Sequence, residues 1–195
     1  VEFRFNAPVK KLEKVEDHFR IESAGGTVEA KIVINAAGLY SDVIHNMVSE
    51  DTFVITPRRG EYSLLDRTEG DLVHNTLFQL PSKMGKGVLV TPTVDGNILI
   101  GPTSEDLEDK EDISTTRQGL FGIIDTGKID VNYLPTGKII TSFAGLRARG
   151  DRDDFIIGPA PDEPNFINVA AIESPGLTSA PAIALYIRDM VADMT

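Results

Sequence analysis

The fold class depends most on the stretch Ile32-Val33-Ile34-Asn35-Ala36-Ala37-Gly38. Its three consecutive apolar residues predict a strand buried on both faces, as in a parallel sheet covered by helices. A turn of small residues follows, and a short helix is predicted next, with Ser41 as its N-cap and apolar residues at helical spacing through Val48. Strand, turn and helix in this order are how α/β folds place ligands at strand ends.

The residues before this stretch predict a β-hairpin. His18–Ser23 alternates apolar and polar side chains, Ala24-Gly25-Gly26 is a turn signal, and Val28–Ile32 resumes the alternation. The middle of the chain is also predicted to be β. Residues 54–65 form a strand with a kink at Gly60, and Val94-Asp95-Gly96 joins two strands as a hairpin turn.

Two longer helices are predicted further along. The first begins at Ser114 or Thr115 and runs to about Ile124, although Gly119 and Gly122 weaken it. Strands follow at 139–147, 155–158 and 166–171. The second helix begins at about Ser179, where apolar residues recur at the spacing of one helix face. The members of that stripe are Ile183, Ile187, Met190 and Val191.

Together these elements predict a mixed α+β protein with a large antiparallel or mixed β-sheet flanked by helices. We expect three segments: residues 1–50, a β-rich domain at 51–143, and residues 144–195 as a closing strand, turn and helix. The first and last have α/β character, so we expect them to meet in space.

Composition narrows the function. The 195 residues are 41% hydrophobic and include 30 acidic and 19 basic residues, which gives a formal net charge of -11. A broad nucleic-acid or anionic-membrane surface needs a positive face, so neither partner is expected. The absence of cysteine excludes thiolate chemistry within the chain and mildly favours the cytoplasm. No apolar run is as long as a membrane span, which takes roughly 20 residues.

Arginines are the candidate anion ligands. Arg147 closes an apolar strand, where a guanidinium can bind phosphate or carboxylate with two hydrogen bonds. The alternative is that Arg147 or Arg149 pairs with the nearby aspartates. Arg59 lies beside Gly60 and could point into a pocket, or it could belong to a charged edge strand.

The closing helix start is a second candidate site. Residues 174–180 are mostly small, and helix N-termini carry free N–H groups that bind electron-rich ligands. The alternative is simple capping by Ser179. The acidic run 104–112 is predicted to be a solvated loop and not a calcium site, and no metal site is predicted. His74 is a weak candidate for a general base.

Three stretches together resemble the FAD-dependent oxidoreductases of the D-amino-acid oxidase type, in the glycerol-3-phosphate dehydrogenase-like branch. They are Ile32–Gly38, Phe143-Ala144-Gly145-Leu146-Arg147, and Ile172–Pro181. Residues 57–62, 87–93 and 101–102 strengthen the resemblance, which covers nearly the whole chain.

The resemblance implies FAD as cofactor and assigns residues to it. Ala36, Ala37 and Gly38 match the turn beside the adenosine and pyrophosphate, and Gly145 and Leu146 match the strand end beside the isoalloxazine. The turn under the flavin is matched by Ser174, Pro175, Gly176, Leu177 and Thr178. Arg147 is similar to the arginine that binds a small anionic substrate, and Arg59 is a candidate second anion ligand.

The family's Gly-rich dinucleotide-binding unit is missing from the sequence. We therefore expect a fragment of a longer flavoenzyme: the substrate domain with a remnant of the FAD-binding domain. Such a piece should not turn over alone, FAD is expected in the full-length parent and not in this chain, and exposed apolar surface would favour a homodimer; whether the isolated chain binds flavin is not indicated. We expect a cytoplasmic location, with any membrane association through partners; the electron acceptor and the catalytic base are not indicated.

Several functions stay open from the sequence. The first is oxidation of glycerol 3-phosphate by hydride transfer to flavin. The substrate could instead be a 2-hydroxy acid of the 2-hydroxyglutarate type or an amino acid, because a guanidinium suits phosphate and carboxylate alike. A non-catalytic anion-binding module and a structural domain are the alternatives from other classes.

Overall fold

The computed structural model describes residues 1–80, 87–152 and 154–194. The chain divides into two compact units. Unit 1 comprises Val1–Thr56 and Ala148–Thr195, and unit 2 comprises Pro57–Arg147. The divisions therefore fall six residues and four residues after those expected at 50/51 and 143/144.

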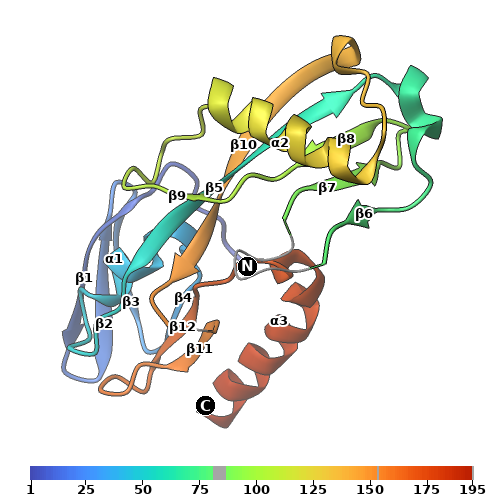
Figure 1. The fold of residues 1–195 in the computed structure, drawn as a ribbon. Coiled ribbons are helices and arrows are strands. Elements are labelled where there is room, and N and C mark those ends of the chain that lie inside the picture. The colour runs from blue at the N-terminus through green and yellow to red at the C-terminus, as the bar shows by residue number, and fades with distance from the viewer. Residues whose placement is uncertain (81–86, 153, 195) are drawn as a thin grey trace. The chain divides into compact units, whose positions relative to one another are not determined.

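Unit 1 contains two three-stranded sheets (Figure 1). The first is antiparallel and consists of β1 (Val9–Val15), β2 (His18–Ser23) and β3 (Gly26–Ala30). Its alternation has a physical cause: Leu12 and Phe19 are buried, and Phe19 packs against Phe166 of the second sheet. The predicted hairpin is confirmed.

The second sheet has the order β11-β12-β4. Its strands are β4 (Val33–Asn35), β11 (Ile156–Pro159) and β12 (Phe166–Ala170). β4 is parallel to β12, as predicted for this stretch. The prediction that β4 is buried on both faces is wrong for the chain as it stands, since Ile34 is 48% exposed.

Three helices complete unit 1: η1 (Gly38–Tyr40), α1 (Ser41–His45) and α3 (Gly176–Asp193). Ser41 is not the N-cap of α1, because that position is Tyr40 and the Ser41 hydroxyl donates to the carbonyl of Gly38. α3 begins three residues before the predicted Ser179. Its predicted apolar stripe lies on the inner side, where Ile187 is buried.

Unit 2 is built on one six-stranded sheet with the order β10-β5-β8-β7-β6, and β9 also pairs with β5. The longest strands are β5 (Ile55–Leu65) and β10 (Ile139–Gly150), each of which starts or ends in unit 1. The others are β6 (Leu77–Phe78), β7 (Leu89–Pro92), β8 (Ile98–Gly101) and β9 (Glu105–Asp106). The β7–β8 hairpin is confirmed, whereas β5 runs through Gly60 without the predicted kink.

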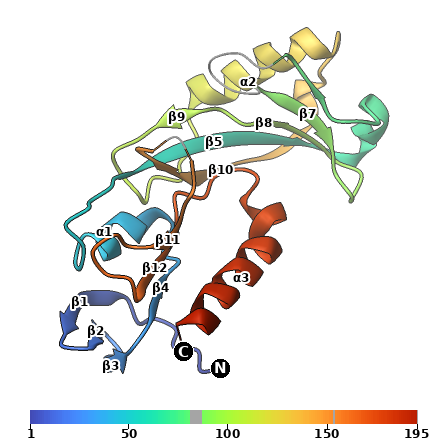
Figure 2. The same cartoon turned by 90° about the horizontal axis from the view of Figure 1, so that it is seen from below.

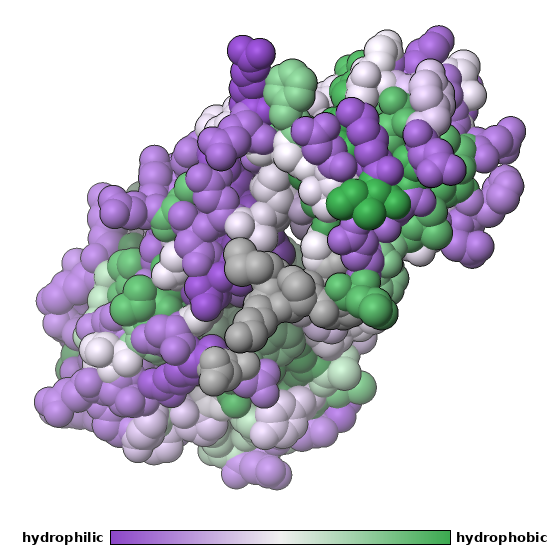
Figure 3. Space-filling model, viewed as in Figure 1, coloured by the Kyte–Doolittle hydropathy of each residue, from purple (hydrophilic) through white to green (hydrophobic). Residues whose placement is uncertain are grey.

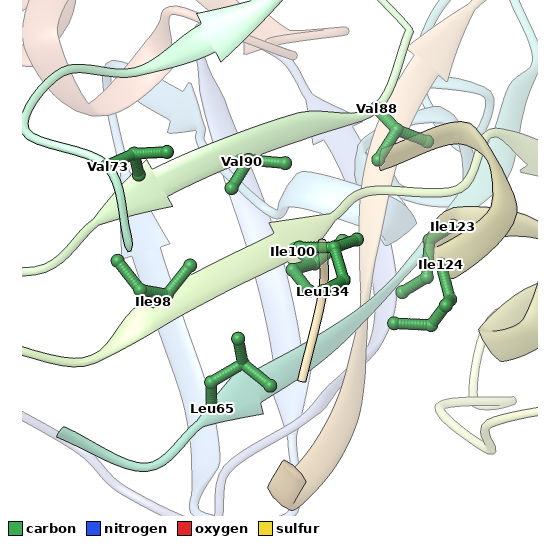
Figure 4. Packing of buried hydrophobic residues seen from close by; sticks show 9 residues of the cluster. All are labelled: Leu65, Val73, Val88, Val90, Ile98, Ile100, Ile123, Ile124 and Leu134. Carbon is green, nitrogen blue, oxygen red and sulfur yellow. The ribbon is translucent and has the colours of Figure 1, made fainter. Parts of the chain in front are cut away.

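Helix α2 (Arg117–Asp130) covers one face of this sheet (Figures 1 and 2). Ile123 and Ile124 of α2 meet Leu65, Val90 and Ile98 of the strands in one apolar cluster (Figure 4). The short helix η2 (Arg67–Leu72) lies between β5 and β6, and η3 (Thr136–Lys138) lies between α2 and β10. The cluster leaves the opposite face of the sheet uncovered by α2.

The surface of unit 2 is mixed in character. Hydrophobic patches lie among hydrophilic side chains over α2 (Figure 3), and that helix exposes Phe121 and Ile129.

No helix within the described residues combines the length and apolarity that a membrane crossing requires. The described part of the chain also contains no cluster of three or more metal-ligating side chains, including in the acidic run.

Candidate functional site

The alternation of β5 sorts its side chains onto two faces of the sheet. Glu61 and Leu65 are fully buried on the face that carries α2. Tyr62 is half-buried and points to the other face, where its ring stacks on Phe143 of β10 at a centroid distance of 5.3 Å. Successive odd-numbered residues of β10 share that face, so Gly145 and Arg147 lie along it beyond Phe143.

Two glycines make room on this face. A Cβ at Gly60 would lie 2.9 Å from the Cβ of Pro102 and 3.5 Å from Nη2 of Arg147. Gly101 has a φ of +143°, and a Cβ there would lie 2.6 Å from the Tyr62 ring. The missing side chain at Gly101 therefore leaves room for the Tyr62 ring, and the missing side chain at Gly60 leaves room for Pro102, whereas the Arg147 guanidinium lies at ordinary contact distance from Gly60.

A backbone carbonyl orients Arg147. Its Nη2 donates to the carbonyl oxygen of Thr103 at 3.0 Å, and the side chain is half-buried. Among the residues that the structure describes, no carboxylate lies within ion-pair distance of this guanidinium. The alternative that Arg147 pairs with the following aspartates is not found for Asp151 and Asp154; Asp153 lies outside the described residues.

Tyr62 is part of the same surroundings. Burial raises the pKa of its phenol, and the positive charge of Arg147 partly offsets that rise. The hydroxyl therefore stays protonated at neutral pH and is available as a hydrogen-bond donor. The sequence did not identify Tyr62 as a candidate site residue. Its place in the site depends on stacking with Phe143, which lies 81 residues further along the chain.

Arg59 has a different role from the one expected. Its side chain is 4% exposed and forms ion pairs with Glu105 at 2.6 Å and Asp112 at 3.0 Å. The Glu105 carboxylate raises the pKa of the guanidinium, which also donates to Ser114. This geometry does not support Arg59 as a second anion ligand; it ties the loop 105–114 to β5. The edge-strand alternative is also wrong, since β5 pairs on both sides.

In unit 1, the N–H groups of Leu177 and Thr178 at the start of α3 have no partner among the described residues, whereas that of Gly176 donates to the Glu173 carbonyl at 2.7 Å. The N-cap of α3, Pro175, makes no side-chain capping bond, and the Ser179 hydroxyl donates to the carbonyls of Pro175 and Gly176 instead. The alternative of simple capping by Ser179 is therefore wrong. No acidic residue lies in the first turn, and Leu177 and Thr178 are exposed. This donor set suits an electron-rich ligand edge such as that of a flavin.

A buried network of hydrogen bonds supports the turn after β4, residues 36–38. Asn35 accepts from the Ala37 N–H at 3.4 Å and donates to the carbonyl of Ser41 and to Asn168. Asn168 in turn bonds Nδ1 of the buried His45. Ala36, Ala37 and Gly38 are left exposed, and Gly38 has a φ of +56° with nothing near a built Cβ.

The predicted cofactor residues thus fall into two sets. Ala36–Gly38 and the 174–178 turn lie in unit 1, and Gly145 and Leu146 lie in unit 2 beside Arg147. An apolar groove of about 590 Å³ in unit 1 is lined by Ile34 and Gly176, with Arg188 as its charged residue. His74, the weak candidate for a base, is exposed in the segment between η2 and β6.

Comparison with known proteins gives consistent matches. The family model for FAD dependent oxidoreductase, DAO, matches residues 1–190. The chain is 55% identical over 183 residues to a glycerol 3-phosphate dehydrogenase from Caloramator mitchellensis, covering 94% of this chain and 38% of the relative. It is 39% identical over 158 residues to a glycerol 3-phosphate oxidase from Mycoplasma pneumoniae, covering 80% and 41%.

A solved structure matches over the same region. It is the dithionite-reduced L-alpha-glycerophosphate oxidase from Mycoplasma pneumoniae with FAD bound, with a TM-score of 0.82 and 34% identity. The match covers 95% of this chain and 49% of that one, so the chain spans about half the length of the relatives it matches or less. Because the family model spans almost every residue, the chain belongs to the DAO family of FAD-dependent oxidoreductases.

Proposed function

We propose that this chain forms part of a flavoenzyme that oxidises glycerol 3-phosphate. The observation that carries the proposal is Arg147: a half-buried guanidinium at the end of β10, fixed on one side by the Thr103 carbonyl and without a carboxylate partner among the described residues. Its remaining donors can hold a phosphate with two parallel hydrogen bonds. The names of the relatives at 55% and 39% identity favour glycerol 3-phosphate over other anions.

FAD, when bound, would supply the two-electron acceptor for the substrate's C–H bond. In unit 1, Ala36, Ala37 and Gly38 would hold it; the family resemblance also assigns Gly145 and Leu146 of unit 2 to this cofactor. Ser174–Thr178 would line it, with the N–H groups of Leu177 and Thr178 available at the start of α3, whose positive dipole end favours negative charge on the bound group. Ala36, Ala37, Gly38 and Gly145 are small and exposed, which suits a close approach of a ligand to the backbone.

Within unit 2, Arg147 would bind and orient the substrate anion. The stacked rings of Tyr62 and Phe143 would cover the strands beside it and exclude water from that part of the face. The Tyr62 hydroxyl, still protonated at neutral pH, would be a further donor. A 2-hydroxy acid or an amino acid would meet the same guanidinium through a carboxylate, so these are the competing substrates in the test.

The substrate assignment is tested by ligand binding to the purified chain. Glycerol 3-phosphate should perturb the NMR signals of β10 and β5, glycerol at the same concentration should not, and 2-hydroxyglutarate should bind more weakly. Arg147→Ala should remove the response, whereas Arg149→Ala, a second arginine of β10 that has an interaction of its own, should keep it. Equal binding of glycerol and glycerol 3-phosphate would contradict the proposal that Arg147 binds the phosphate.

The cofactor assignment is tested by titrating the chain with FAD and following flavin fluorescence. We expect no tight binding, because the sequence lacks the Gly-rich loop that grips a pyrophosphate. Stoichiometric binding would mean that the chain builds a flavin site without that loop, and steady turnover of glycerol 3-phosphate would contradict the expected inactivity of these residues alone.

A further inference from the structure

Thr103 is fixed to β5 by hydrogen bonds of both its backbone N–H and its side-chain hydroxyl. Its N–H donates to the Glu61 carbonyl at 3.2 Å, and its hydroxyl oxygen accepts from the Glu61 N–H at 2.9 Å. The hydroxyl hydrogen can reach the Arg59 carbonyl or Oε2 of Glu61, each at 3.5 Å. The side chain therefore replaces a ladder bond at a point where the chain has left β8 and has not yet entered β9.

Glu61 is itself immobilised. Its carboxylate is fully buried and accepts from the N–H and the hydroxyl of Thr116, the N-cap of α2. A Cβ at Gly119 would overlap Oε2 of Glu61, so the glycine in the first turn of α2 is what admits the carboxylate. β5, the start of α2 and Thr103 are thereby joined in one hydrogen-bonded cluster.

This cluster ends at the candidate anion ligand. The Thr103 carbonyl is the acceptor for Nη2 of Arg147 at 3.0 Å. A guanidinium on a long side chain has many rotamers, and a fixed acceptor on one nitrogen restricts which way its other donors point. The direction of the Arg147 donors thus depends on where the Thr103 carbonyl is held.

We propose that Thr103 is a positioning residue for Arg147, with its hydroxyl holding the carbonyl that aims the guanidinium and Glu61 anchoring that hydroxyl to α2. The inference rests on the proposed function of Arg147 as the anion ligand. Thr103 does not contact the anion; it acts through its main chain.

The test uses Thr103→Val, which keeps the β-branched shape and removes the hydroxyl, with inorganic phosphate as the probe. Phosphate affinity should fall roughly 3- to 10-fold, the effect of losing one ordinary hydrogen bond. Thr103→Ser keeps the hydroxyl and should restore most of the affinity. Thr93→Val is the matched control, because Thr93 also accepts a backbone N–H, that of Asn97, in the β7–β8 hairpin. It should lower stability without changing phosphate affinity.

A second measurement reports on Arg147 directly. The ¹⁵N signals of its guanidinium should indicate slowed rotation in the wild type and in Thr103→Ser, and faster rotation in Thr103→Val. Unchanged rotation and unchanged affinity in Thr103→Val would overturn the inference, as would an equal loss of affinity in Thr93→Val. If Arg147→Ala binds phosphate as well as the wild type does, the proposed function fails, and the rotation of Arg147 still decides whether Thr103 positions it.

Discussion

At the scale of single residues, two of the three glycines of α2, Gly119 and Gly122, differ in what surrounds them although they are three positions apart. A Cβ built on Gly119 would lie 1.5 Å from Oε2 of the buried Glu61, whereas one built on Gly122 meets nothing within 4 Å. Helix propensity treats both as equally unfavourable. The difference between the two positions comes from Glu61 of β5, which is far away in the sequence. The sequence pattern therefore could not show that Gly119 is required, and it counted both glycines against the helix.

We therefore expect the two alanine substitutions to change stability in opposite directions. Gly119→Ala should cost about 2 kcal/mol or more, because the carboxylate must move from a fully satisfied position. Gly122→Ala should stabilise by about 0.5–1 kcal/mol, the usual gain in an exposed helix interior. Urea unfolding followed by circular dichroism measures both, and a stabilising Gly119→Ala would contradict the position of Glu61.

Asp162 gives the chain a defined response to acid. Its carboxylate accepts from the Ser49 hydroxyl at 2.6 Å and from the Glu50 N–H at 2.7 Å, and these bonds hold the pKa of Asp162 below its usual value. A lowered folded-state pKa contributes stability above the unfolded value, about 3.9, and this contribution is lost as the pH falls through the folded-state pKa.

Asp162→Asn should accordingly lower the Tm at pH 7, and the difference from the wild type should shrink below about pH 4. Asp95→Asn makes the same change of charge in the β7–β8 turn, where Asn-Gly is equally suitable, and should leave the Tm nearly unchanged at both pH values. Thermal melts between pH 3 and 7 decide this. A difference for Asp162→Asn that grows toward acid would have the wrong sign.

At the scale of elements, α3 is a helix whose apolar residues differ widely in burial. Ile187 is 7% exposed and lines the apolar groove, while Leu185 on the same helix is 53% exposed. Ile187→Ala should cost about 2 kcal/mol, near the lower limit for such a truncation, because the groove leaves one side of Ile187 without neighbours. Leu185→Ala should cost less than about 0.5 kcal/mol. Equal costs in chemical denaturation would mean that α3 is not packed as described.

The strand pairs that local pattern predicted are those whose partners are close in sequence, namely β2–β3 and β7–β8, which follow from alternation and turn residues. The continuous apolar run of β4 predicted a parallel sheet but not its partner β12, which lies far along the chain. β9 is only two residues long, lies in an acidic run and exists because Glu105 and Asp106 pair with Arg59 and Arg58. No local signal distinguishes such a strand from a solvated loop.

The candidate site divides along the same line. Arg147 was identifiable because a guanidinium closing an apolar strand has a recognisable pattern. Arg59 was misjudged because its carboxylate partners lie 46 and 53 residues away and leave no mark in the sequence around it. Thr103 had no signal at all, since its hydroxyl bonds to residues of β5 more than 40 positions earlier and its carbonyl accepts from Arg147, 44 positions later.

At the scale of the whole molecule, unit 2 is an insertion within unit 1. Unit 1 consists of two segments, 1–56 and 148–195, and unit 2 is the single segment between them. A folded unit 2 holds the ends of that segment at fixed positions, whereas an unfolded one leaves a loop of about 90 residues. Closing such a loop costs about 4 kcal/mol of chain entropy. Unit 1 should therefore depend on unit 2 far more than unit 2 depends on unit 1.

Destabilising one core at a time should reveal this asymmetry. Ile98→Ala removes a fully buried side chain from the core of unit 2, and Phe166→Ala does the same in unit 1. Each should cost about 3 kcal/mol locally.

In hydrogen exchange, Ile98→Ala should reduce protection in both units, because opening unit 2 releases the loop. Phe166→Ala should reduce protection in unit 1 and leave the amides of β7, β8 and α2 close to their wild-type rates. Equal losses in both units for both variants would mean that the two cores unfold as one cooperative body, and the insertion would then have no separate thermodynamic meaning.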